Sequence, residues 1–282
     1  MKLVADANVW YHISTGRIDP LQFKGHGDRL HATPTSLLEI ASGINERLLE
    51  ERKGAASAVL KYADGVLEDA ETHLAALWGV DTNRDEVPWM EGFRAIASAT
   101  SVEELEHGVF DYTSQVVRRV GVSTVHDWRL MHWRDFQEQI VIALDDWIPG
   151  YRDARAEGKF KRIPKQNKSA FQDGTRSREV KVMLTLATYE RVRLADSDLP
   201  SPSNEQIAKA ESLLAPYVDA YCEYIIRCAT EYAPQENDFG DCENFIYLQD
   251  DTSLVTSDDR WVKIAQTVCP SQIVVPEVRV GK

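Results

Sequence analysis

Four acidic residues stand at positions where their carboxylates could meet at one site, although no two are close in the sequence. They are Asp6, Glu39, Asp241 and Asp258. Asp6 follows the apolar run at residues 2–5 and Asp258 follows the run at residues 253–256, and each run predicts a buried strand. Asp241 and Glu39 are each expected near the start of a helix. Because helix N-termini and the carboxyl ends of parallel strands share one edge of an α/β sheet, where ligands bind, we expect the side chains to converge there.

The chemistry of such a cluster follows from its charge. Converging carboxylates repel one another, and a bound cation relieves that repulsion. Hard oxygen ligands favour Mg²⁺ or Mn²⁺ over zinc. Such an ion can activate water and stabilise charge on a phosphate and its leaving oxygen. The acids therefore predict metal-assisted hydrolysis of a phosphodiester without a covalent intermediate.

Each acid also has a purely structural interpretation. Asp6 could cap the turn after its strand, and Asp241 or Asp258 could be the N-cap of a helix. Glu39 could be the back-reaching half of a capping box that Ser36 opens. The sequence leaves both interpretations open for each of the four residues.

Neighbouring polar residues are alternative candidates for two of the acids, or could support them. Asp238 is the alternative third acid or a fifth one, and Asp259 is the alternative fourth acid. Asn8 and Thr256 could support the acids or contact a substrate, with ordinary turn hydrogen bonding as the other interpretation.

Strand and helix patterns alternate at both ends of the chain, which predicts an α/β fold built on a parallel sheet. Further strands are predicted at residues 30–33 and 273–275, and helices at residues 36–52, 244–248, 260–267, 124–147 and 205–232. The last of these helices is expected to break near Pro216. We divide the chain into a discontinuous core, residues 1–54 and 233–282, and a large, mostly helical insertion, residues 55–232.

Charge and composition limit the classes of protein to consider. The 282-residue chain is long enough for one large domain or two small ones, and its net charge of -13 is unlike that of a protein that simply coats nucleic acid. Residues 152–181 are the exception, with ten Lys or Arg against four acids. Phe160 and Phe171 lie among these charges. The segment could bind phosphates and unpaired bases, or could be a solvated loop.

The cysteines and the apolar runs indicate the cellular compartment in which the protein is expected. The four cysteines form no C-x-x-C pair and fit no common zinc spacing, so we expect reduced thiols in a cytoplasmic protein. The apolar start is too short for a signal-peptide core, and no run reaches the roughly 20 apolar residues of a membrane helix. We therefore expect no membrane contact.

Four segments together resemble the PIN-domain nucleases, which include the toxin ribonucleases of bacterial toxin–antitoxin pairs. They are residues 4–10 (VADANVW), 33–40 (TPTSLLEI), 241–248 (DCENFIYL) and 254–258 (LVTSD). The resemblance places the first aspartate of such nucleases at Asp6, the helix glutamate at Glu39, the third acid at Asp241 and the acid of the T-x-D element at Asp258. Asn8 and Thr256 fall where these proteins place supporting polar residues.

The resemblance implies a three-layer sandwich around a central parallel sheet and Mg²⁺- or Mn²⁺-dependent cleavage, usually of RNA. It covers roughly residues 1–50 and 235–280, and the helical middle is far longer than compact members of the family need. We therefore expect a metal-dependent endonuclease that acts on RNA or another single-stranded nucleic acid. An antitoxin protein and a homo-oligomer are further expected partners. The alternatives are a structure-selective DNA nuclease, guided by the basic segment, and an inactive PIN-like binding module.

Overall fold

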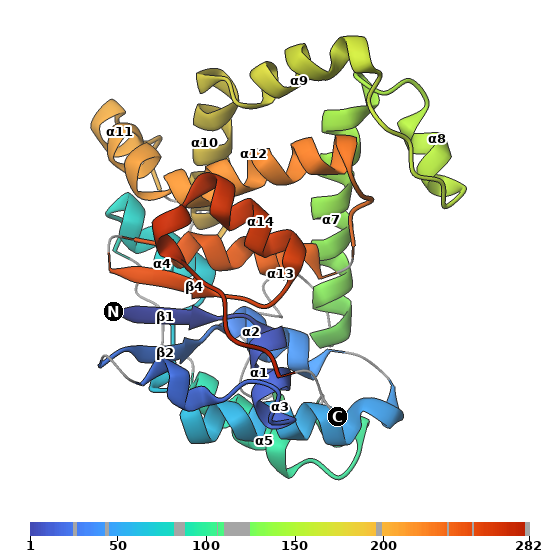
Figure 1. Ribbon diagram of the computed structural model, residues 1–282. Helices are drawn as coiled ribbons and strands as arrows, with labels where there is room; N and C mark the ends of the chain where they lie inside the picture. Colours follow the sequence, from blue (N-terminus) through green and yellow to red (C-terminus); the bar gives the residue numbers. More distant parts are fainter. Residues whose placement is uncertain are drawn as a thin grey trace.

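A five-stranded, all-parallel sheet with the order β3-β2-β1-β4-β5 lies at the centre of the computed structural model (Figure 1). The structure describes residues 1–24, 27–42, 45–81, 88–105, 107–109, 125–195, 199–235, 237–249 and 251–279. The strands are β1 (Lys2–Ala5), β2 (Arg29–Ala32), β3 (Gly65–Val66), β4 (Thr252–Val255) and β5 (Ile273–Val274). Because β1 pairs with both β2 and β4, segments from the two ends of the chain are neighbours in the sheet.

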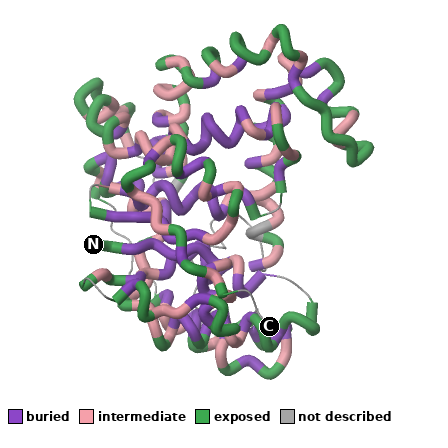
Figure 2. The backbone as a smooth tube through the Cα atoms, in the orientation of Figure 1, coloured by how far each residue is buried: buried purple, intermediate pink, exposed green. Residues whose placement is uncertain are grey.

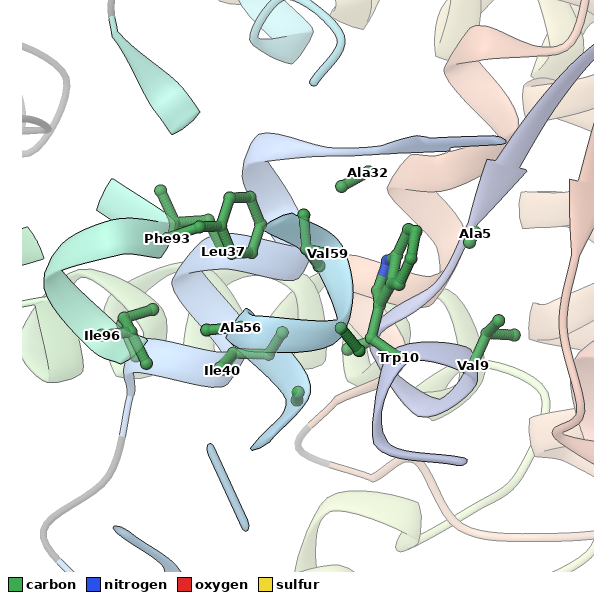
Figure 3. Close-up of a cluster of buried hydrophobic side chains, with 14 of the residues drawn as sticks. Ala5, Val9, Trp10, Ala32, Leu37, Ile40, Ala56, Val59, Phe93 and Ile96 are labelled. Carbon is green, nitrogen blue, oxygen red and sulfur yellow. The ribbon is translucent and has the colours of Figure 1, made fainter. Parts of the chain in front are cut away.

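Helices pack against both faces of the sheet. The helices nearest the strands are α1 (Ala7–Ser14), α2 (Pro34–Ala41), α3 (Leu49–Tyr62), α5 (Trp89–Ser98), α12 (Ala215–Thr230), α13 (Asp238–Glu243) and α14 (Asp259–Val268). In β4, Val255 belongs to the apolar cluster built with α1, α2, α3 and α5, whereas Leu254 belongs to the cluster built with α12 and α14. Trp10 of α1 is fully buried in the first cluster, beside Ala5 and Val59 (Figure 3).

The remaining helices are α4 (Ala70–Trp78), α7 (Val125–Asp145), α8 (Tyr151–Ala156), α9 (Lys168–Thr175), α10 (Arg178–Ala195) and α11 (Asn204–Leu213). Among them, α8, α9, α10 and α11 lie in the upper part of Figure 1, α7 runs along one side, and α4 lies near β4. Short 3-10 helices lie at Pro20–Phe23, Glu46–Leu48, Lys165–Asn167, Asn244–Tyr247 and Pro270–Gln272. Helices α4, α10, α11 and α12 enclose a third apolar cluster that contains the buried Trp78. Helix α7 contacts α2 and α13 as well as α12 and α8, so it links the sheet region to the outer helices.

The α/β class and the parallel sheet are confirmed, and the strands that were predicted lie within one residue of their expected bounds. The break expected near Pro216 is also confirmed, because α11 ends at Leu213 and α12 begins at Ala215. Helix α7 matches the prediction at residues 124–147, although residue 124 lies outside the described residues.

Two helix predictions next to the acids are wrong. The helix expected at residues 36–52 is two helices, α2 and α3, because Thr33 is the N-cap of α2, Pro34 its first residue, and Ser42 has extended backbone that ends it. The Thr33 hydroxyl accepts the Ser36 amide at 3.1 Å, which places the N-cap three residues earlier than the predicted Ser36. The run at residues 244–248 is largely a 3-10 helix, and the α-helix before it begins at Asp238.

Residues beyond the predicted core boundary also build the sheet. Helix α3 runs without interruption across residues 54 and 55, and β3 pairs with β2 at the edge of the sheet. The division into a core and an insertion stays a prediction. All four cysteines are buried and free, as expected of reduced thiols. None of the described helices is long and apolar enough to cross a membrane.

Candidate functional site

Asp6 lies directly beyond the end of β1, next to the end of β4. The register that pairs Ala5 with Val255 brings Asp6 beside Thr256, and the Asp6 amide donates to the Val255 carbonyl at 3.2 Å. The Asp6 side chain is only 2% exposed, and its Oδ1 accepts the Val9 amide at 2.9 Å as the N-cap of α1. The capping interpretation is therefore confirmed for Oδ1. Oδ2 is buried and accepts no well-formed hydrogen bond from the described residues.

Asp258 sits across the same edge, in the turn between β4 and α14. The Thr256 hydroxyl accepts the Asp258 amide at 3.1 Å, and Asp258 Oδ1 accepts the Arg260 amide at 2.8 Å. Asp258 is therefore the N-cap of α14, which confirms its structural interpretation. Its side chain is half-buried, whereas the alternative acid Asp259 is exposed on the first turn of α14. Burial thus favours Asp258 over Asp259 as a member of the site.

Glu39 and Asp241 come together where α2 packs against α13. Neither is a cap: the N-cap of α2 is Thr33 and that of α13 is Asn237, so the capping interpretations of Glu39 and Asp241 are wrong. The Glu39 carboxylate lies directly against α13 at residue 240, because this residue is a glycine and a methyl group there would overlap a Glu39 carboxylate oxygen. Asp241 is 4% exposed and Glu39 is half-buried.

A pocket of about 190 Å³ opens over this pair. It is lined by Ala7, Asn8, Tyr11, Glu39, Ser42, Leu48, Arg52, Asn237 and Asp241. Three of the residues predicted for the site, Asn8, Glu39 and Asp241, therefore share one pocket wall. Asp6 and Asp258 do not line it, and they act on it through their charge.

The pKa shifts show how strongly these carboxylates interact. Burial raises the pKa of Asp241 well above its ordinary value, and the negative charges of Glu39, Asp6 and Asp258 raise it further. The pKa of Asp6 is raised to about 6, chiefly by burial and also by Asp258, while hydrogen bonds from Thr256 and the Val9 amide oppose the shift. Asp6, Glu39 and Asp258 therefore lie within electrostatic reach of Asp241, although the roles of the four acids as ligands stay predictions.

Arg260 is a member of this region that the sequence interpretation missed. Its guanidinium lies 2.9 Å from Asp238 and 3.4 Å from Asp258. Asp238, fully buried, also accepts the Tyr224 hydroxyl at 2.6 Å and the Gln235 amide at 2.5 Å. Asp238 is thus occupied in holding Arg260 and α13, unlike Asp241. The sequence did contain a signal for this role of Arg260. The residue is a cation two positions after Asp258, at the start of a helix whose N-cap is acidic.

A second buried arrangement fixes α13 against α2. Glu243 accepts the Thr35 hydroxyl at 2.6 Å and pairs with Arg191 at 2.7 Å, and Arg191 also pairs with Glu71 at 2.5 Å. The two acids come from α13 and α4 and the arginine from α10. Helices of the predicted insertion therefore help to position the helix that carries Asp241. No local sequence pattern indicates a contact between residues so far apart.

The fit of these acids to a metal ion depends on what their oxygens already bind. No three His, Cys, Asp or Glu side chains of the described residues are already arranged to hold an ion. Two observations fit a cation at this edge: the buried Oδ2 of Asp6 lacks a well-formed hydrogen bond, and neighbouring carboxylates raise the pKa of Asp241. A cation bound there would satisfy the oxygen and offset the repulsion.

No protein-family model matches the chain, and no match is found among curated proteins or among solved structures.

Replacing Gly240 by Ala tests whether the position of Glu39 against α13 matters. The new methyl group overlaps the Glu39 carboxylate and lies close to Thr35. We expect a loss of about 1–3 kcal/mol in the free energy of unfolding, measured in urea. If the chain cleaves nucleic acid with a metal ion, as its sequence predicts, this activity should also fall by about 10- to 100-fold, as when groups that orient a metal ligand are altered.

The matched control is Gly174→Ala in α9, where a methyl group would meet no described atom within 4 Å. This variant should keep wild-type activity and stability. Adding Glu39→Ala to Gly240→Ala removes the overlap with the carboxylate but not the close contact with Thr35, so the double variant should regain part of the stability and none of the activity. Full activity in Gly240→Ala would contradict a role for Glu39 in this position.

Proposed function

We propose that the chain is a Mg²⁺- or Mn²⁺-dependent nuclease of the PIN type, with a three-layer core, that hydrolyses phosphodiester bonds in RNA. The observation that carries the proposal is the set of carboxylates around Asp241, whose pKa is raised by burial and by Glu39, Asp6 and Asp258. A buried cluster of like charges is unfavourable unless a cation joins it. A cation held by carboxylate oxygens beside an open pocket suits phosphoryl chemistry.

Each residue of the site has a separate role in the proposed reaction. Asp6 and Asp241 are the residues that would hold the ion, with Asp258 adding negative charge at the same edge. When bound, the ion supplies positive charge that neutralises the phosphate and makes it a better electrophile. Glu39, on the pocket wall, accepts the proton that the attacking water loses, and Asn8, which lines the same pocket, is placed to donate a hydrogen bond to the substrate.

Buried contacts keep these groups in position. Thr256 joins the ends of β1 and β4, since its hydroxyl accepts the Asp258 amide and lies against the Asp6 carboxylate. Arg260 holds Asp258 and Asp238 in place from α14. RNA is preferred to DNA as the substrate because of the resemblance to toxin ribonucleases. A toxin role with an antitoxin partner is part of the same expectation.

Cleavage of matched oligonucleotides with and without metal tests the proposal. We expect the purified protein with Mn²⁺ to cut a single-stranded RNA of mixed sequence, and EDTA to abolish the activity. Cleavage of the matched DNA alone would replace the RNA proposal by the DNA nuclease. If neither is cut, and calorimetry detects no Mn²⁺ binding, the protein is not a nuclease and the binding module remains.

A further inference from the structure

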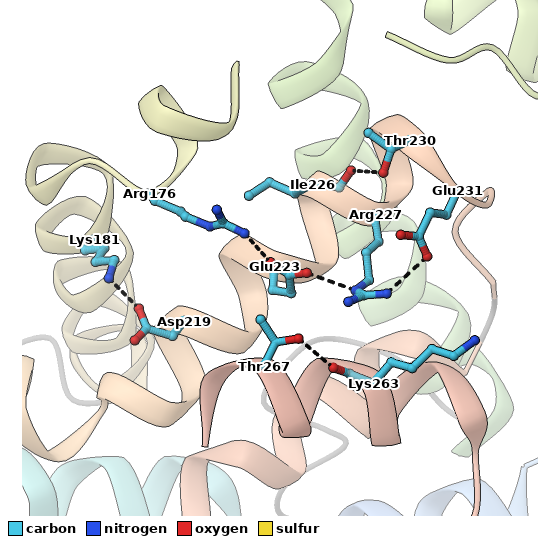
Figure 4. Close-up of polar contacts among 10 residues, drawn as sticks. All are labelled: Arg176, Lys181, Asp219, Glu223, Ile226, Arg227, Thr230, Glu231, Lys263 and Thr267. Carbon is cyan, nitrogen blue, oxygen red and sulfur yellow. Dashed lines mark hydrogen bonds and ion pairs between the residues drawn. The ribbon is translucent and has the colours of Figure 1, made fainter. Parts of the chain in front are cut away.

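The ten cations at residues 152–181 do not form one surface. Those near the two ends are paired with acids of the helical scaffold: Arg152 with Glu138 at 2.8 Å, Arg176 with Glu223 at 2.7 Å and Lys181 with Asp219 at 2.7 Å. Figure 4 shows the last two of these pairs. Phe171, expected as a possible partner for bases, is buried against Trp147 with ring centroids 5.5 Å apart. The ends of the segment are therefore structural.

The central part is different, and we call residues 158–168 the basic arm. It contains five cations and no acid, in a chain whose acids outnumber its cations by 45 to 32. These cations are Lys159, Lys161, Arg162, Lys165 and Lys168, and all five are exposed. Arg162, Lys165 and Lys168 form no ion pair with any described residue. Figure 2 shows the outer segment around α8 as largely exposed.

The basic arm also exposes an aromatic ring. Phe160 is 37% exposed, and the Arg162 guanidinium lies 5.7 Å from its ring centroid. An exposed ring beside a cation offers a stacking surface to an unpaired base, whose adjacent phosphates the cations attract. A duplex keeps its bases stacked on each other and cannot use such a ring in the same way. The chemistry of the basic arm therefore favours a single strand.

The basic arm is tied to helices that also contact the acidic site. The Ile163 amide donates to the Ala229 carbonyl at 2.9 Å, which ties the arm to the end of α12. Helix α7 runs from α13, where the His132 ring lies 5.4 Å from that of Phe239, to its end at Asp145 before α8 (Figure 1). Thirteen residues of helix span about 20 Å. At a stacked spacing of 3.4 Å this corresponds to on the order of six nucleotides.

We propose that the basic arm binds single-stranded nucleic acid and holds the substrate of the acidic pocket at a point several nucleotides from the cut. This inference rests on the proposed nuclease function for its link to the pocket, but not for the binding itself. It predicts that substrates too short to reach both places lose the contribution of the arm.

The test is binding of fluorescently labelled RNA single strands of 5 and 20 nucleotides in EDTA, so that no cleavage is needed. The variant is Arg162→Gln/Lys165→Gln/Lys168→Gln. We expect its affinity for the 20-nucleotide strand to fall at least about tenfold. The slope of log affinity against log salt concentration should also decrease in magnitude by about 2, because each phosphate that the arm no longer neutralises contributes about 0.7. Phe160→Ala should weaken binding of the same strand by about tenfold.

The matched control removes three exposed lysines elsewhere, as Lys24→Gln/Lys209→Gln/Lys263→Gln. We expect it to bind both strands nearly as the wild type does. Equal weakening by the two triple variants, or none by the first, would overturn the inference, as would binding to anionic vesicles in place of RNA. If the arm binds RNA but the protein cleaves none, the basic arm is an RNA-binding surface and the proposed nuclease function is wrong.

Discussion

Replacing Asp6 by Asn will lower the rate of RNA cleavage by about 100-fold or more, since even groups that only orient a metal ligand contribute about 10- to 100-fold. The substitution removes the negative charge and leaves the fold intact. Asn is as good an N-cap as Asp, and its Oδ1 can accept the Val9 amide as Asp6 does. The measurement is the initial rate with Mn²⁺ and a labelled RNA, at a substrate concentration well below KM.

Asp259→Asn is the matched control, because it removes the same charge from an exposed residue on the first turn of α14. We expect this variant to cleave at the wild-type rate. If Asp6→Asn instead keeps full activity while Asp259→Asn loses it, the site has been assigned to the wrong acids, even though the class of enzyme is right.

Without metal, the free energy of unfolding of the wild-type protein will fall as the pH rises. In Asp6→Asn this decrease will be smaller. The pKa of Asp6 is raised from 3.8 to about 6 in the folded state. Between these values the folded protein holds a proton that the unfolded chain has released, so the free energy of unfolding falls as the pH rises through this window. The full loss, reached above pH 6, is about 3 kcal/mol. Asp241, with its raised pKa, acts in the same direction.

Urea unfolding in EDTA at several pH values measures this effect. The advantage of Asp6→Asn over the wild type should be near zero at about pH 4 and reach about 3 kcal/mol at pH 7. Mn²⁺ at 100 times its Kd should then stabilise the wild type by about 2.7 kcal/mol and Asp6→Asn by much less. An advantage that does not change with pH, or an Asn variant less stable than the wild type at pH 7, would contradict the raised pKa.

The strands and the first acid could be predicted because their signals are local. Residues 2–5 are apolar and end at an aspartate, and the structure has β1 at the same residues. The placement of Asp6 and Thr256 side by side then follows from the order of two parallel strands, which needs no knowledge of the helical middle. The T-x-D spacing likewise separated Asp258 from the exposed Asp259.

The rest could not be predicted because distant residues decide it. Strand β3 is only two residues long, too short for any periodicity to show. The start of α2 depended on a choice between Thr33 and Ser36 as the N-cap, and Pro34 decides it by favouring the first helical position. The pairing of Arg191 with Glu243 joins residues that only the folded chain brings together.

Anomalous diffraction from a Mn²⁺-soaked crystal of the full chain tests the metal-dependent site most directly. We predict an anomalous peak between the carboxylates of Asp6 and Asp241, present in the wild type and absent in Asp6→Asn. A crystal that holds Mn²⁺ elsewhere, or that shows no peak at this edge of the sheet under saturating Mn²⁺, would contradict the assignment of these acids as ligands.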